Sequence, residues 1–175
     1  TLSLHDALPI WNFAYGANVN QDKMINGRRI TPLESLPGML EGYRLTFNHH
    51  GGMGNVEKMT TAAASYFQAR GIYGVHGVLH RLSHTDFARL SNMESGYRPV
   101  EVDVHASDGR GMIKAVVFIT PQHRSVRDGL APPDRYHHLI LRGAKEWNLN
   151  ADYVRWLESL ESIPFRNRGP LYWRT

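Results

Sequence analysis

The sequence contains no cysteine among its 175 residues. This absence excludes a disulfide scaffold, a thiolate nucleophile and any zinc or iron–sulfur site built on cysteine. It also fits a reducing compartment. The chain has no apolar run near the roughly 18 residues that a membrane-spanning helix needs. We therefore expect a cytoplasmic protein that has no membrane partner.

Concentrated positive charge is also missing. Lys and Arg number 20 and Asp and Glu 16, which gives a net charge of +4 with histidine neutral. The only tight basic groups are Arg28-Arg29 and Arg166-Asn167-Arg168. Nucleic-acid-binding domains usually cluster their basic residues more strongly, so we expect no nucleic-acid partner. Hydrophobic residues make up 42% of the chain, which is typical of one folded domain with a substantial core.

The first ten residues, TLSLHDALPI, differ in character from the rest of the chain. They look like one reading frame of a sequencing adaptor, and they lack the basic start and small-residue cleavage site of a signal peptide. A native leader is the alternative. We predict a non-native leader at 1–10, a single domain at 11–163 and a loosely held tail at 164–175.

Alternation and turn signals predict the secondary structure. Strands are expected at 11–15, 40–48, 60–67 and 72–82, and a hairpin at 100–105 and 112–120 turns at Asp108-Gly109. Helices are expected from Ser83 to Gly96, from Pro132 to Trp147 and after Asn150. Because strands mostly precede helices and are consecutive along the chain, the pattern favours an α+β fold with a largely antiparallel or mixed sheet.

Several familiar motifs are absent. The run Gly51-Gly52-Met53-Gly54 matches neither a P-loop nor a dinucleotide fingerprint, so a wide turn is favoured over a phosphate loop. The chain has ten histidines, but no HExxH or similar ligand spacing. A Ser–His–Asp triad has no GxSxG elbow to support it. We therefore predict no metal site and no cofactor.

A stronger candidate combines the segment Phe13–Asn18, FAYGAN, with Glu94. A strand that runs straight into a turn of small residues leaves backbone N–H groups free to hold a carboxylate or an oxyanion. Glu94 is expected at a helix C-terminus, where the helix dipole is negative, and this suits a group that takes up and returns a proton. From the residues alone, an ordinary strand-end turn and a solvent-facing glutamate remain open.

These segments resemble the γ-glutamylcyclotransferase family, whose fold group also contains the AIG2-like proteins. FAYGAN at 13–18 is similar to the family's substrate loop. The resemblance continues through LEGYRLTFN at 40–48, GVLHRLSHTDFARL at 77–90 and RYHHLILRGAKEWNL at 135–149, and then Asp152-Tyr153. It covers nearly all of residues 11–161.

The resemblance implies a small mixed β-barrel with flanking helices. It implies an enzyme of glutathione metabolism that needs no cofactor and converts a small γ-glutamyl amino acid or amine to 5-oxoproline plus the free amino acid or amine. Glu94 would be the catalytic general acid and base. Tyr15, Gly16, Ala17 and Asn18 would form the loop that receives the γ-glutamyl head, and Tyr97 and Tyr136 would line the pocket. A homodimer is left open.

Three departures from the family pattern concern rate and substrate. Ala17 replaces the usual serine but keeps the backbone donor, the segment from Glu94 to Tyr97 is shorter than usual, and Val117 stands where some members carry a pocket tyrosine. The chain looks closer to the dipeptide-type branch than to the branch that acts on glutathione. Two other functions remain open: a ligand-binding or regulatory module on the same fold, and a hydrolase that uses water as the nucleophile.

Overall fold

The structure of the protein is a computed structural model that describes residues 8–126 and 131–164. Most of the predicted leader and of the predicted tail falls outside the described residues. The elements in chain order are β1 Ile10–Ala14, η1 Ala17–Val19, η2 Lys23–Gly27, β2 Glu34–Glu41, β3 Tyr43–His49, η3 His50–Gly52, β4 Met53–Lys58, α1 Thr61–Gln68, β5 Gly74–Leu82, α2 His84–Met93, β6 Arg98–Ala106, β7 Gly111–Ile119, η4 Gln122–Arg124, α3 Asp134–Glu146 and α4 Ala151–Ser159.

Five of the strands close into a barrel in the order β1-β5-β2-β6-β7. All neighbours pair antiparallel except β1 and β7, which pair parallel where Asn12 meets Val116. The Asn12 side chain strengthens this closure by donating a hydrogen bond of 3.0 Å to the Val116 carbonyl. Strands β3 and β4 form a separate two-stranded sheet. The predicted α+β class, with a small mixed barrel, is confirmed.

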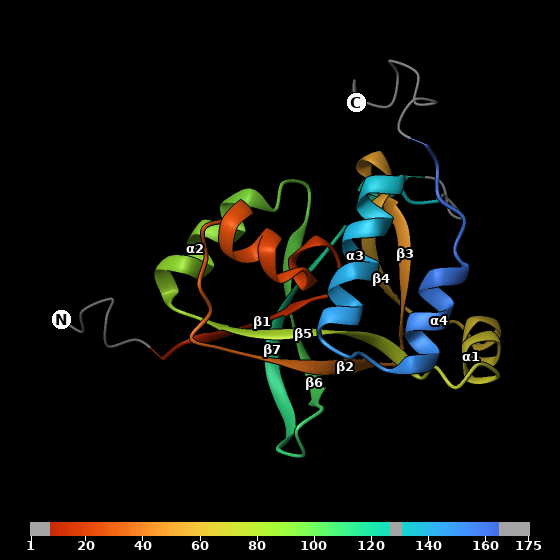
Figure 1. Ribbon diagram of the computed structural model, residues 1–175, viewed down its shortest axis with the longest axis horizontal. Coiled ribbons are helices and arrows are strands. Elements are labelled where there is room, and N and C mark those ends of the chain that lie inside the picture. The colour runs from red at the N-terminus through yellow and green to blue at the C-terminus, as the bar shows by residue number, and fades with distance from the viewer. Residues whose placement is uncertain (1–7, 127–130, 165–175) are drawn as a thin grey trace.

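Helices flank the barrel on two sides (Figure 1). Helix α2 packs against β1 and β5, while α3 packs against η1 and α4. The β6–β7 hairpin extends well beyond the other barrel strands. Among the described helices, none combines the length and hydropathy that crossing a membrane requires.

The predicted elements with clear end signals are found where expected. The Ser83 side chain caps α2 by accepting a hydrogen bond from the Asp86 N–H, and the Asn150 side chain caps α4 by accepting from the Tyr153 N–H. The hairpin turns around Asp108-Gly109, and β5 falls within its predicted range. Strand β1 begins at Ile10, one residue before the predicted domain boundary, and Ile10 pairs with Leu82.

Three local predictions are wrong. The expected strand at 60–67 is helix α1, because Thr60 caps it and three alanines, which favour a helix, lie at 62–64. The expected strand at 40–48 is divided at Gly42, whose φ of +75° ends β2 and starts β3. The wide turn expected at Gly51-Gly52-Met53-Gly54 gives way to β4 from Met53 onward.

Candidate functional site

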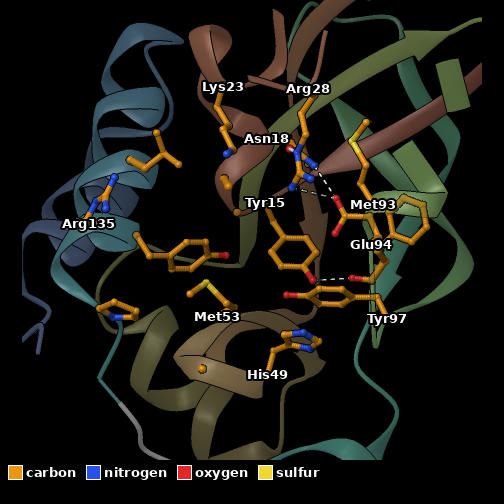
Figure 2. Close-up of a pocket in the computed structure, with 18 of the residues that line it drawn as sticks. Tyr15, Asn18, Lys23, Arg28, His49, Met53, Met93, Glu94, Tyr97 and Arg135 are labelled. Carbon is orange, nitrogen blue, oxygen red and sulfur yellow. Dashed lines mark hydrogen bonds and ion pairs between the residues drawn. The ribbon is translucent and has the colours of Figure 1, made fainter. Parts of the chain in front are cut away.

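A cavity of about 1060 Å³ opens where the end of β1, η2, η3, the end of α2 and the start of α3 meet. Its lining includes every site residue predicted from the sequence: Tyr15, Gly16, Ala17, Asn18, Glu94, Tyr97 and Tyr136. These residues come from three segments that are far apart in the sequence. The fold therefore brings the FAYGAN loop and the predicted acid–base residue to one place (Figure 2).

The loop after β1 is held by buried polar contacts. The Asn18 carbonyl lies 3.0 Å from Nε2 of His80, and Nδ1 of His80 lies 2.7 Å from the Ser35 hydroxyl. Because a carbonyl only accepts, Nε2 carries the proton and Nδ1 accepts from Ser35. Burial lowers the pKa of His80 to about 4, so its ring is neutral at neutral pH. From the other side, Trp147 Nε1 donates a hydrogen bond of 3.0 Å to the Val19 carbonyl.

Glu94 is the C-cap residue of α2, and its carboxylate points into the cavity rather than to solvent. Asn18 Nδ2 donates a hydrogen bond of 2.9 Å to Glu94 Oε1. An Arg28 terminal nitrogen lies 3.7 Å from the same oxygen, and the Glu94 side chain is only 11% exposed. The solvent-facing alternative for Glu94 is therefore wrong. Arg28 supplies a positive charge where the helix dipole is negative.

The Tyr136 hydroxyl lies against two backbone segments of the cavity wall. It accepts a hydrogen bond of 2.9 Å from the Gly54 N–H, and the Ala17 amide bonds to the same oxygen. A Cβ on Gly54 would lie 2.6 Å from that oxygen, and a Cβ on Gly16 would lie closer still. Glycine is thus required at both positions for the hydroxyl to reach the backbone. Burial raises the pKa of Tyr136, so its hydroxyl keeps its proton.

Tyr15 and Tyr97 build the floor of the cavity. The Tyr15 hydroxyl donates a 2.5 Å hydrogen bond to the Phe118 carbonyl, and the Tyr97 hydroxyl donates one of 2.7 Å to the Gly54 carbonyl. Burial raises the pKa of both phenols, so both stay neutral. The His49 ring stacks on Tyr97 with centroids 3.8 Å apart, and burial lowers its pKa to about 4.

The cavity also contains residues that the sequence analysis did not assign: Lys23, Arg28, His49, Met53, Met93 and Arg135. In the sequence, Arg28 stands out only as half of the basic pair Arg28-Arg29. No short motif connects it to Glu94, because the two residues approach only through the tertiary fold. The described residues bring together no group of three or more His, Asp or Glu side chains that could bind a metal ion.

Comparison with known proteins agrees with this architecture. Residues 74–157 match the model of the AIG2-like family, a stretch that contains Glu94, Tyr97 and Tyr136. A γ-glutamylcyclotransferase of Bos taurus is 24% identical over 159 residues, which are 89% of this chain and 81% of that protein.

Solved structures share the fold. A γ-glutamyl cyclotransferase structure superposes with a TM-score of 0.69 at 20% identity, covering 94% of this chain and 95% of that one. An uncharacterized protein from Homo sapiens superposes with a TM-score of 0.69 at 19% identity, covering 90% of each chain. The predicted resemblance to the γ-glutamylcyclotransferase family is confirmed.

Proposed function

We propose that the protein is a cyclotransferase that converts a γ-glutamyl amino acid or amine to 5-oxoproline and the free amino acid or amine. The observation that carries the proposal is the Glu94 carboxylate, fixed inside a cavity that the FAYGAN loop also lines. Asn18 and Arg28 both contact Oε1, so Oε2 remains available to a substrate. A carboxylate held in this way is suited to proton transfer at a bound amine.

The proposed reaction occurs within one bound molecule. Glu94 takes one proton from the substrate's α-ammonium group, and the freed nitrogen attacks the γ-carbonyl carbon to close a five-membered ring. The bond from that carbon to the leaving nitrogen then breaks as Glu94 gives its proton to this nitrogen. The ring nitrogen loses a second proton, which balances the protonation of the released amine. Ring closure of this kind depends mainly on orientation.

Charge develops on the γ-carbonyl oxygen during the attack, and donors near Tyr136 are suited to stabilise it. The Tyr136 hydroxyl accepts from backbone amides and so can direct its own proton into the cavity. Apart from the Ala17 amide, the backbone N–H groups of the loop from Tyr15 to Asn18 are further donors in this proposal. Because the phenol keeps its proton at neutral pH, it can act there as a hydrogen-bond donor.

The function as a non-catalytic binding module is less well supported, because the cavity is open and Glu94 faces into it. The relatives named γ-glutamylcyclotransferase also favour an enzyme. A hydrolase would use the same carboxylate to activate water. The two reactions differ in their product, since hydrolysis releases glutamate and cyclisation releases 5-oxoproline.

The test is to incubate the purified protein with γ-glutamyl dipeptides, glutathione and γ-glutamyl amines, and to identify products by mass spectrometry. We expect 5-oxoproline together with an equal amount of the free amine. Glutamate as the product would indicate the hydrolase. Binding without turnover of any compound would indicate the module.

A further inference from the structure

Arg28 and Glu94 place opposite charges side by side in the cavity wall. An Arg28 terminal nitrogen lies 3.7 Å from Glu94 Oε1, and the two side chains are 21% and 11% exposed. This separation exceeds the roughly 2.7–2.9 Å of a direct charge-assisted hydrogen bond. The Arg28 Nε donates to Asn18 Oδ1 at 3.2 Å. No further acceptor for the guanidinium lies among the residues that the structure describes, so several N–H donors remain available.

We propose that Arg28 binds the α-carboxylate of the γ-glutamyl head, so that the Arg28–Glu94 pair recognises a substrate whose α-amine and α-carboxylate are both free. The inference rests on the proposed function. The amine and the carboxylate of an amino acid are attached to one carbon, so the groups that bind them must be neighbours. Arg28 meets this requirement, because it lies beside the Glu94 carboxylate, which receives the substrate's α-amine.

The other cations that line the cavity are less well placed to bind the substrate's α-carboxylate. Lys23 and Arg135 also line the cavity, but among the described residues neither forms an ion pair with Glu94. The Ala17 amide, one of the backbone donors predicted to hold the carboxylate, is bonded to the Tyr136 hydroxyl. Guanidinium also matches a carboxylate with two parallel N–H donors, which an ammonium group does not offer.

The local backbone holds Arg28 in place. Arg28 comes directly after η2, a π-helical turn, and its N–H donates to the Lys23 carbonyl at 2.8 Å. Arg29 has a φ of +56°, which is uncommon for a residue with a side chain. Met24 within η2 and Ile30 directly after Arg29 are both fully buried and anchor this segment. Single π-helical turns and strained backbone are frequent at functional sites.

The test compares γ-glutamyl-alanine with its analogue in which the glutamyl α-carboxylate is a carboxamide. Cyclisation and binding are both measured for the wild type, Arg28→Gln, Arg28→Lys and the control Lys23→Gln. We expect the wild type to prefer the carboxylate by about tenfold to a hundredfold in kcat/KM, the range of a charged hydrogen bond. Arg28→Gln should lose this preference, Arg28→Lys should keep part of it, and Lys23→Gln should keep all of it.

The ratio between the two substrates is the decisive readout, because a general disturbance of Glu94 would slow both equally. An unchanged ratio in Arg28→Gln, or a ratio lost in Lys23→Gln, would overturn the inference. If the wild type binds without cyclising, the same ratio is read from the dissociation constants. In that case the proposed function fails while the inference on carboxylate binding is still decided. Absence of both binding and turnover would overturn both.

Discussion

Asn18 and Glu94, which are 76 positions apart, are joined by a hydrogen bond of 2.9 Å from Asn18 Nδ2 to Glu94 Oε1. Asn18 also accepts from Arg28 Nε through its side-chain oxygen. The amide thus separates and orients two charged groups. In the proposed reaction, this bond fixes which carboxylate oxygen faces the substrate amine.

Replacing Asn18 with alanine should therefore slow cyclisation. A hydrogen bond to a charged group contributes about 1.5–3 kcal/mol, so we expect kcat/KM to fall by about tenfold to a hundredfold. Asn26→Ala is the control, because Asn26 is exposed and its side chain, among the described residues, bonds to Asp22 alone, at 2.6 Å. Steady-state measurement of 5-oxoproline release decides the matter. Equal rates in the two variants would show that Asn18 does not orient Glu94.

Glu94→Gln should remove the proton-transfer group while keeping its size. General acid–base groups contribute about 10²–10⁴ in rate, so kcat should fall by at least the lower of these factors. Substrate binding should be largely retained, because Arg28 and the loop at Tyr15 to Asn18 remain. The control is Glu101→Gln, whose side chain is 70% exposed on β6. Full activity in Glu94→Gln would remove Glu94 from the mechanism.

A steric test addresses the contact between Gly54 and Tyr136. In Gly54→Ala, the new Cβ would lie 2.6 Å from the Tyr136 hydroxyl oxygen, so the ring must move. We expect a loss of about 1–3 kcal/mol in the free energy of unfolding, together with reduced activity. Chemical denaturation measures the first effect and 5-oxoproline release the second.

Tyr136→Phe supplies the matched control, because it removes the clashing oxygen. The double variant Gly54→Ala/Tyr136→Phe should lose less free energy of unfolding than the sum of the losses in the two single variants, as expected for residues in contact. Additive losses would mean that the hydroxyl and Gly54 do not constrain each other.

The sequence predicted the elements that have local end signals, and it failed where only tertiary contacts decide. Ser83 and Asn150 identify α2 and α4 through their capping side chains. By contrast, the first part of β2 was missed because it contains Pro37 and Gly38. Proline has no N–H to donate within a sheet and glycine has no side chain to pack, so neither residue indicates a strand. The Thr, Tyr and Phe of 60–67 favoured a strand, whereas the Thr60 cap and the alanines produce a helix.

The candidate site divides in the same way. The loop from Tyr15 to Asn18 and Glu94 were accessible through motifs, and they line one cavity. Arg28 could not be found from a motif, because its position depends on the π-helical turn η2 and on the left-handed backbone of Arg29, which no short pattern indicates. Gly54 was assigned to a wide turn, and its contact with Tyr136 arises only when α3 packs beside β4.

The final prediction concerns acid stability. Burial lowers the pKa of His49, His76 and His80 from 6.5 to about 4. Unfolded chains bind these protons near pH 6.5, whereas the folded protein excludes them until about pH 4. The unfolded state therefore binds more protons in this window, and the free energy of unfolding should fall as the pH drops from about 6.5 to about 4.

Each of these three histidines should contribute a slope of up to about 1.4 kcal/mol per pH unit. Urea denaturation at a series of pH values measures the total slope. His76→Gln should lower the total slope by the contribution of one histidine, since the pKa of His76 is lowered by burial. His84→Gln is the control, because His84 lies at the surface, where its ring contacts the Leu8 carbonyl. A slope that His76→Gln leaves unchanged would show that this ring is protonated in the folded protein, and its packing against Tyr153 would need another explanation.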